Sequence, residues 1–234
     1  MEKTFVQMVL EQFKYLIDKH SFDILSSVES PRGYRWEGGV KYATEKTYID
    51  IDCTRGESPS FWIGRTKDVK RQSKMFQYLL PIDLIYEYMT FSDEEKAIAT
   101  SLLGSRKIQE LLHHKQVYFQ LPKTDDEAEQ MELELSAYAR IVEKYAKPFL
   151  RGDFSKWPAI WKYSVDKGIA EWIQPDRSEF ARVAIPQGDG TYKTYGKQQF
   201  EQDSVDYVNQ LKQHVYKDVL DYVAELKDEL GEAA

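Results

Sequence analysis

Hydrophobic residues near the start of the chain follow the spacing of a helix. Phe5, Val9 and Leu16 belong to a set that recurs at steps of three and four residues. This spacing predicts an amphipathic helix over residues 4–19 with Thr4 as its N-cap. From Phe22 onward the pattern changes to short apolar or alternating runs separated by turn residues, at 22–28, 40–43, 48–53 and 60–64. Such runs are typical of antiparallel strands, so we expect a small sheet here.

The run 48–53 shows the clearest alternation. One face would carry Ile49, Ile51 and Cys53, and the other Tyr48, Asp50 and Asp52, because successive side chains of a strand point to opposite faces. We therefore predict that the first set lies in the core and that the second set faces solvent.

Helical spacing returns after Arg65. The apolar stripe of residues 75–89 predicts a helix that Pro81 divides near Leu80, because proline lacks an amide hydrogen and clashes with the preceding turn. Ser92 followed by Glu95 forms a capping-box pattern, which starts a helix that is expected to end at Gly104. A shorter helix is predicted at 106–114, before the apolar run 117–121.

The hydrophobic pattern of the second half of the chain predicts mainly helices. A stripe from Ala128 to Tyr145 predicts one helix, and Ser155 can cap another that runs to Gly168. A hairpin is expected at 180–195, followed by a long helix over 201–230 that would measure roughly 45 Å. The predicted fold class is α+β, with a small antiparallel sheet near the N-terminus packed against a predominantly helical body and a long C-terminal helix.

The 234 residues, of which 42% are hydrophobic, are enough to bury a full core. A single domain over 1–234 is the simplest organisation. Within it, a sheet subdomain at 1–66 would precede a helical remainder at 67–234 that includes the hairpin.

The net charge and the cysteine content disfavour some classes of partner and cellular compartment. Thirty-two Lys and Arg against 39 Asp and Glu give a net charge of -7, which disfavours broad attraction to nucleic acid or an anionic membrane. Cys53 is the single cysteine, so the chain can form no internal disulfide, which suits a reducing compartment. No targeting segment is recognisable, and the longest run without charged residues, 97–105, is far shorter than the ~20 residues of a membrane span. We expect a cytoplasmic protein without a membrane association.

No common catalytic or cofactor motif occurs in the sequence. It lacks the phosphate-binding loop, the dinucleotide fingerprint, the zinc-binding H-E-x-x-H helix and the G-x-S-x-G elbow. We therefore expect no cofactor, and the sequence favours a non-enzymatic function over an enzymatic one.

Asp50 and Asp52 form one candidate site. Alternate residues of a strand place both carboxylates on one face, where a hard divalent cation finds oxygen ligands. A metal-dependent nuclease or hydrolase using this pair is therefore one alternative function. The acid-x-Lys arrangement expected on a following strand is missing from 61–64, which favours a solvated polar face instead.

A basic segment forms a second candidate. It consists of Arg65, Lys67, Lys70, Arg71 and Lys74, with Asp68 as the opposing acid, and it begins shortly after Phe61 and Trp62. Basic side chains beside aromatic ones suit phosphate and base contacts. Nucleic-acid binding through this segment is the second alternative function. A solvated helix face or a docking patch for an acidic partner would account for the same residues.

Aromatic residues crowd the predicted sheet, and those on its solvent face would serve as anchors for another protein. The predicted protein-binding surface consists of Tyr42, Tyr48, Asp50, Asp52 and Trp62.

Two stretches carry a resemblance to known proteins. One is 5–22, a helix ending in Lys-His-Ser-Phe before strands, and the other is 139–155, with Tyr-Ala, Pro-Phe-Leu and Gly-Asp-Phe-Ser. Together they resemble small bacterial proteins of uncharacterised function, some of them immunity-like. The resemblance implies a small α+β protein that binds another protein stoichiometrically, and it assigns no functional residue. The leading hypothesis is therefore a non-enzymatic protein-binding module, such as a bacterial immunity or regulatory factor, whose oligomeric state stays open.

Overall fold

The computed structural model describes residues 3–30, 36–54, 58–69, 78–99, 124, 126–172, 183–186, 192–195 and 217–231. Contacts divide the chain into two compact units. The first comprises Met1–Met89 with Gln116–Phe154, and the second comprises Thr90–Lys115 with Ser155–Ala234. Part of the chain that the sequence analysis placed in the helical remainder therefore belongs with the sheet.

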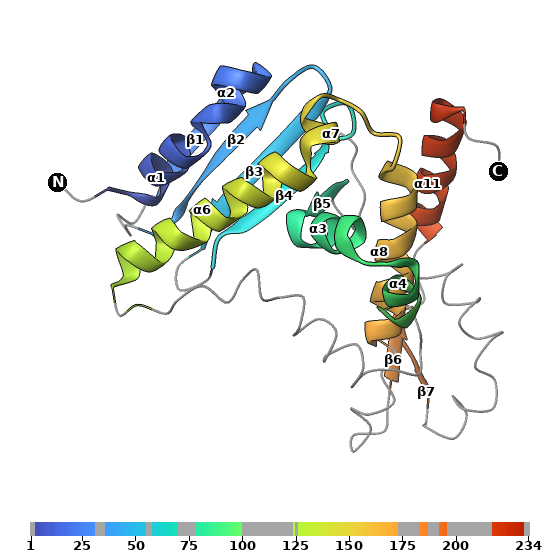
Figure 1. The fold of residues 1–234 in the computed structure, drawn as a ribbon. Coiled ribbons are helices and arrows are strands. Elements are labelled where there is room, and N and C mark those ends of the chain that lie inside the picture. Colours follow the sequence, from blue (N-terminus) through green and yellow to red (C-terminus); the bar gives the residue numbers. More distant parts are fainter. Residues whose placement is uncertain are drawn as a thin grey trace. The chain divides into compact units, whose positions relative to one another are not determined.

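The first unit contains a five-stranded antiparallel sheet whose strands follow chain order (Figure 1). The strands are β1 (Asp23–Glu29), β2 (Gly38–Ala43), β3 (Thr47–Cys53), β4 (Ser60–Arg65) and β5 (Leu79–Pro81). This sheet, together with the helices, confirms the α+β class. β5 replaces part of the helix predicted at 75–89, and Pro81 ends that strand opposite Trp62. Proline is tolerated there because an edge strand need not donate every amide hydrogen.

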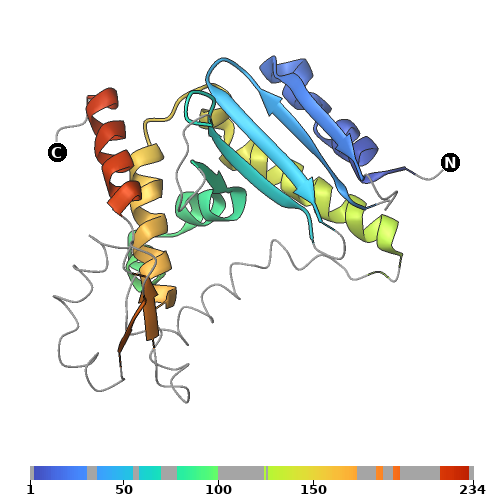
Figure 2. The same ribbon diagram turned by 180° about the vertical axis from the view of Figure 1, so that it is seen from behind.

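Five helices accompany the sheet in the described part of this unit: α1 (Phe5–Gln12), α2 (Lys14–His20), α3 (Ile82–Thr90), α6 (Glu127–Tyr145) and α7 (Lys147–Leu150). α1 and α6 contact each other and lie on one face of the sheet, and the view from behind shows the strands in front of them (Figures 1 and 2). The helix predicted over 4–19 is interrupted at Phe13, whose backbone has φ −103° and ψ 13°. The N-cap prediction is confirmed, because the Gln7 amide donates to Thr4 Oγ1 and the Gln7 side chain accepts from the Thr4 amide.

The core of this unit lies between the sheet and the helices. Phe61 of β4 packs between Phe13 and Tyr138, with ring centroids 4.8 and 5.3 Å apart, respectively. Ile49 and Ile51 are buried, as is Cys53. The predicted apolar face of β3 is therefore confirmed.

The second unit contains α4 (Asp93–Ala99), α8 (Trp157–Trp172), β6 (Val183–Pro186), β7 (Tyr192–Tyr195) and α11 (Lys217–Leu230). The capping box of α4 is confirmed by reciprocal hydrogen bonds between Ser92 and Glu95. β6 and β7 pair antiparallel at the predicted hairpin. α8 continues past Gly168, where a stop was predicted, to Trp172. The predictions for 106–114, 117–121, Gly104 and 201–216 lie outside the described residues.

None of the helices in the described ranges combines the length and the apolar composition that crossing a membrane requires.

Candidate functional site

Asp50 lies in the middle of the sheet face that the sequence analysis selected. It is opposite Lys41 of β2 and Trp62 of β4. Lys41 Nζ lies 3.3 Å from Asp50 Oδ2, and the Tyr48 hydroxyl donates to the same oxygen at 3.4 Å. Burial raises the pKa of the Asp50 carboxyl, and the charge of Lys41 opposes this rise. The carboxylate is thus held by groups on its own face.

The two tyrosines of the predicted binding surface are buried. Tyr42 lies opposite Ile49, so it belongs to the core face of the sheet, and it is 0% exposed. Tyr48 is on the face of Asp50 but is only 6% exposed, because it packs with Ala43, Leu79 and Trp62. The expectation that these rings face solvent is wrong. Of the three predicted aromatic contacts, Trp62 alone keeps partial exposure.

Asp52 is engaged as well. Its Oδ1 accepts a hydrogen bond of 2.6 Å from the Ser60 hydroxyl on β4. Among the described residues there is no group of three or more His, Cys, Asp and Glu side chains placed to hold a metal ion. Both acids of the predicted metal pair are therefore bound by protein donors, and the metal-dependent alternative stays a prediction.

The basic segment begins with a buried ion pair. Arg65 is 5% exposed and Asp68 2% exposed, and Arg65 Nε lies 3.0 Å from Asp68 Oδ2. Arg65 is therefore not available to bind a phosphate at the surface. The prediction that it belongs to an exposed basic patch is wrong. Lys67 is exposed, whereas Lys70, Arg71 and Lys74 lie outside the described residues. The nucleic-acid alternative stays a prediction.

The edge strand β1 is the most exposed element of the sheet. Six of its seven residues are exposed, and Ser26 is half-buried. The exposed residues include Ile24, Leu25 and Val28, which are 43%, 58% and 57% exposed, respectively. The sequence pattern predicts a strand here but does not show that the strand lies at the edge of the sheet.

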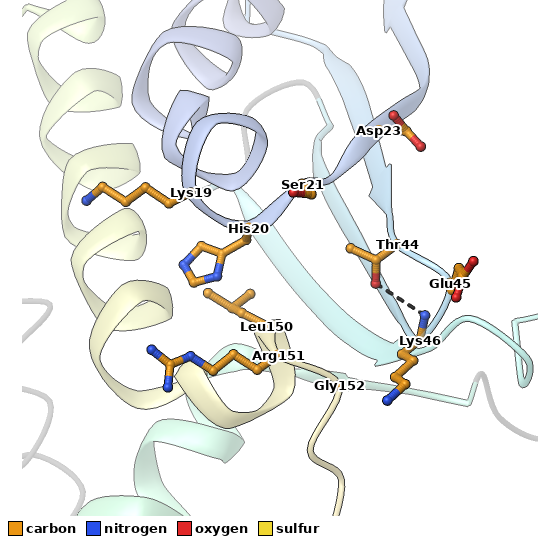
Figure 3. A pocket seen from close by; sticks show the side chains of 10 residues that line it. All are labelled: Lys19, His20, Ser21, Asp23, Thr44, Glu45, Lys46, Leu150, Arg151 and Gly152. Atoms are coloured by element: carbon orange, nitrogen blue, oxygen red, sulfur yellow. Dashed lines mark hydrogen bonds between the residues drawn. The ribbon is translucent and has the colours of Figure 1, made fainter.

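An open pocket of about 520 Å³ lies at one end of the sheet (Figure 3). Three segments line it: the end of α2 with the start of β1 (residues 19–23), the turn between β2 and β3 (residues 44–46), and the end of α7 with the residues that follow it (150–152). The pocket carries the basic side chains Lys19, His20, Lys46 and Arg151 together with the acids Asp23 and Glu45. The sequence pattern does not reveal this pocket, because the three segments come together only in the fold.

Local backbone chemistry holds these three segments in place. Ser21 ends α2 in a left-handed conformation with φ 56°. The Thr44 hydroxyl accepts hydrogen bonds from the amides of Lys46 and Thr47, which fixes the turn. The buried Thr47 hydroxyl donates to the carbonyl oxygen of Phe149, so the turn is tied to α7. The pocket walls are therefore preformed.

The electrostatics around His20 are dominated by cations. Burial lowers the pKa of the His20 imidazole, the positive charges of Arg151, Lys19 and Lys147 lower it further, and Glu143 opposes them. Burial and these cations therefore favour the neutral form of the His20 imidazole. Lys19 is paired with Glu143, with 2.8 Å between Nζ and Oε1.

Gly152 is required at the floor of the pocket, and Gly152→Ala is expected to reduce the free energy of unfolding by about 1–3 kcal/mol. Its φ is +74°, and an added Cβ would lie 2.4 Å from Lys46 Cδ. Urea denaturation provides the measurement. Gly39→Ala is the matched control within the same sheet unit, because a Cβ there meets nothing closer than 3.5 Å. Equal stability of the two variants would contradict the requirement for glycine.

Comparison with known proteins shows no relative: no family model matches the chain, and neither a curated protein nor a solved structure matches it.

Proposed function

We propose that the chain is a non-enzymatic protein-binding module that holds another protein in a stoichiometric complex, as an immunity or regulatory factor does, and that β1 is its contact strand. The exposed edge strand is the observation that carries this proposal. The predicted surface on β3 and β4 contributes less, since Asp50 and Asp52 are bound to Lys41 and Ser60.

The backbone of β1 provides the first argument. β1 pairs with β2 on one side, and no strand of the described sheet pairs with its other side. The amide and carbonyl groups of a free strand edge are a template for a further strand. An extended segment of another protein can therefore extend the sheet by main-chain hydrogen bonds.

The side chains of β1 provide the second argument. Natural proteins protect sheet edges with charged residues or proline, but the stretch from Ile24 to Val28 contains neither. Within this stretch the irregular register between Ile24 and Ser26 is the protective feature, and the charged residues of the strand, Asp23 and Glu29, lie at its ends. Three large apolar side chains exposed on this strand are therefore available for burial under a partner.

The charges at the strand ends favour a different protein over a second copy. An antiparallel pair of β1 strands centred on Ser26 would place Asp23 of one copy opposite Glu29 of the other. Like charges directly opposite each other destabilise a strand pair. Each copy also carries a net charge of -7. The partner that fits is an extended segment with an apolar centre and basic residues at its ends.

The proposal is tested by titrating the full chain with a synthetic peptide of about nine residues, long enough to cover the seven residues of β1. The peptide alternates valine and threonine and ends in lysines. We expect saturable binding by calorimetry, and binding weaker by about tenfold for the double variant Leu25→Ser, Val28→Ser, because the apolar contacts are lost. The matched control is Val69→Ser, which removes an apolar side chain of 37% exposure outside β1.

Two further peptides separate backbone pairing from charge. A central proline removes an amide hydrogen and should abolish binding, and terminal glutamates should weaken it because Asp23 and Glu29 repel them. Equal binding of the proline peptide, or equal binding by the Leu25→Ser, Val28→Ser variant, would show that β1 is not the contact strand. A shift of the free chain to a dimer that depends on Leu25 and Val28 would show that the occupant is a second copy.

A further inference from the structure

We infer that the partner segment runs antiparallel to β1, pairs with residues 26–29 and exchanges main-chain hydrogen bonds with Ser27 and Glu29. Its polar side chains lie on the face of the sheet that carries α1, and its apolar side chains lie on the other face. This inference rests on the proposed function, because it takes β1 as the contact strand. It adds the direction, the register and the side-chain pattern of the partner.

The pairing of β1 with β2 decides which main-chain groups of β1 point to its free edge. The Ser30 amide donates to the Glu37 carbonyl oxygen at 3.1 Å, and the register of this pair continues unbroken along 26–29. Hydrogen-bonded and non-hydrogen-bonded pairs alternate between antiparallel strands, so every second residue back from Ser30 bonds to β2. The residues between them, Ser27 and Glu29, therefore direct their amide and carbonyl groups to the free edge.

The irregular register between Ile24 and Ser26 limits regular pairing to the second half of β1. An extra residue in one strand bends that strand and interrupts its ladder of hydrogen bonds. A straight partner strand consequently cannot stay in register with both halves of β1. Residues 26–29 form the main-chain pairing site, and Leu25, which is 58% exposed, adds a side-chain contact beside it.

The two faces of this pairing site differ in chemistry. Glu29 lies on the face of α1, because its Oε1 accepts a hydrogen bond of 2.8 Å from the hydroxyl of Thr4, the N-cap of α1. Ser27 shares this face, since side chains alternate along a strand. Val28 lies on the other face, opposite Gly39, and is 57% exposed. The site thus presents polar groups on the helix side and an apolar side chain on the far side.

These faces define the residues of the partner. A basic residue opposite Glu29 and a threonine opposite Ser27 form favourable cross-strand pairs, and a β-branched apolar residue opposite Val28 covers its exposed side chain. In an antiparallel partner these residues follow one another in the order basic, apolar, threonine. The antiparallel direction is favoured because it is the more stable pairing per residue, and all the strand pairs of this sheet in the described ranges adopt it.

The first experiment titrates the full chain with the peptide Lys-Val-Thr-Val-Thr-Val-Thr-Val-Lys, whose valines share one face and whose threonines and lysines share the other. In the inferred pairing, the threonine amides point to β1 and the valine amides point away from it. N-methylation of the three threonine amides removes these donors and should weaken binding in calorimetry about tenfold or more. N-methylation of three valine amides is the matched control and should change binding less than about twofold.

Hydrogen exchange of single amides, read by NMR, locates the contact on the chain. In the complex saturated with the unmodified peptide, the amides of Ser27 and Glu29 should exchange about tenfold more slowly than in the free chain, because they gain hydrogen bonds. The amides of Val28 and Ser30 should change little, because they already bond to β2.

A variant of the chain tests the same amide from the other side. Ser27→Pro removes an amide hydrogen that faces the free edge, a position at which a strand tolerates proline, and should weaken peptide binding about tenfold. Ser27→Ala keeps the amide and is the matched control. Circular dichroism shows whether Ser27→Pro is folded, and if it is not, the methylated peptides and the exchange measurement decide the question.

The outcomes separate this inference from the proposed function. If the unmodified peptide binds but the methylated valines weaken it more than the methylated threonines, the register or the direction is wrong, although β1 remains the contact strand. The same conclusion follows if a folded Ser27→Pro binds as well as Ser27→Ala, or if the slowed amides are Val28 and Ser30. If the unmodified peptide does not bind, the proposed contact strand fails, and this inference fails with it.

Discussion

Phe61→Ala is expected to reduce the free energy of unfolding of the sheet unit by about 3–5 kcal/mol, the usual cost of truncating a buried phenylalanine. The Phe61 ring is 4% exposed. It stacks on Tyr138 of α6 with an interplanar angle of 15° and packs at 37° against Phe13. Alanine would leave a cavity at the point where the strand meets both helical segments, and neither neighbouring ring can fill it without leaving its own contacts.

Urea denaturation followed by circular dichroism measures the loss, and hydrogen exchange read by mass spectrometry assigns it to segments. Peptides from β2, β3 and α6 should show the largest gain in exchange. Phe61→Leu serves as the control, because it keeps most of the side-chain volume and should cost less than half as much. A change for Phe61→Ala of no more than about 0.5 kcal/mol, the size of a typical surface effect, would mean that Phe61 is not central to this core.

Local patterns predicted the parts of the fold that depend on neighbouring residues. The caps at Thr4 and Ser92 were predictable because each joins groups three residues apart. The alternation of β3 was predictable because strand geometry alone sets it. β5 was not, because three residues ending at Pro81 are too few to show a period of two, and the helical spacing that follows masks them.

The prediction of a solvent-facing aromatic surface was wrong at positions where the pairing of strands decides which side chains are exposed. Tyr42 follows Lys41, and the alternation of an exposed lysine with buried Val40 and Tyr42 was a usable signal for its place in the core. Tyr48 gave no such signal, since its burial arises from Leu79 and Trp62 on other strands. Arg65 and Asp68 pair over three residues, but this spacing alone did not show that both side chains are buried.

The edge position of β1 and the pocket required the topology itself. The residues of the pocket come from 19–23, 44–46 and 150–152, and more than a hundred positions of the chain separate the second segment from the third. No spacing rule connects such segments, because tertiary contacts alone bring them together. In the sequence, Leu25 and Val28 look like ordinary strand residues. Only the order of the strands shows that, in the described sheet, β1 has a neighbouring strand on one side alone.

Trp157→Ala should have a comparably large effect on the second unit, lowering its free energy of unfolding by about 3–5 kcal/mol. Trp157 of α8 is 0% exposed, and its indole Nε1 donates to the Tyr222 hydroxyl of α11 at 3.3 Å. The ring also lies edge-on to Trp161, which in turn lies edge-on to Tyr222. This aromatic cluster joins α8 to α11, so its removal should expose both helices.

The Trp157→Phe variant separates packing from hydrogen bonding in this cluster. It keeps an aromatic ring but removes the indole donor to Tyr222, and a loss of about 1–3 kcal/mol is expected from leaving a buried polar group with fewer partners. Hydrogen exchange in peptides from α8 and α11 provides the readout, with peptides from β2 and β3 as the internal reference. If Trp157→Ala left exchange in α11 unchanged, the contact between Trp157 and Tyr222 would not be what holds α11 against α8.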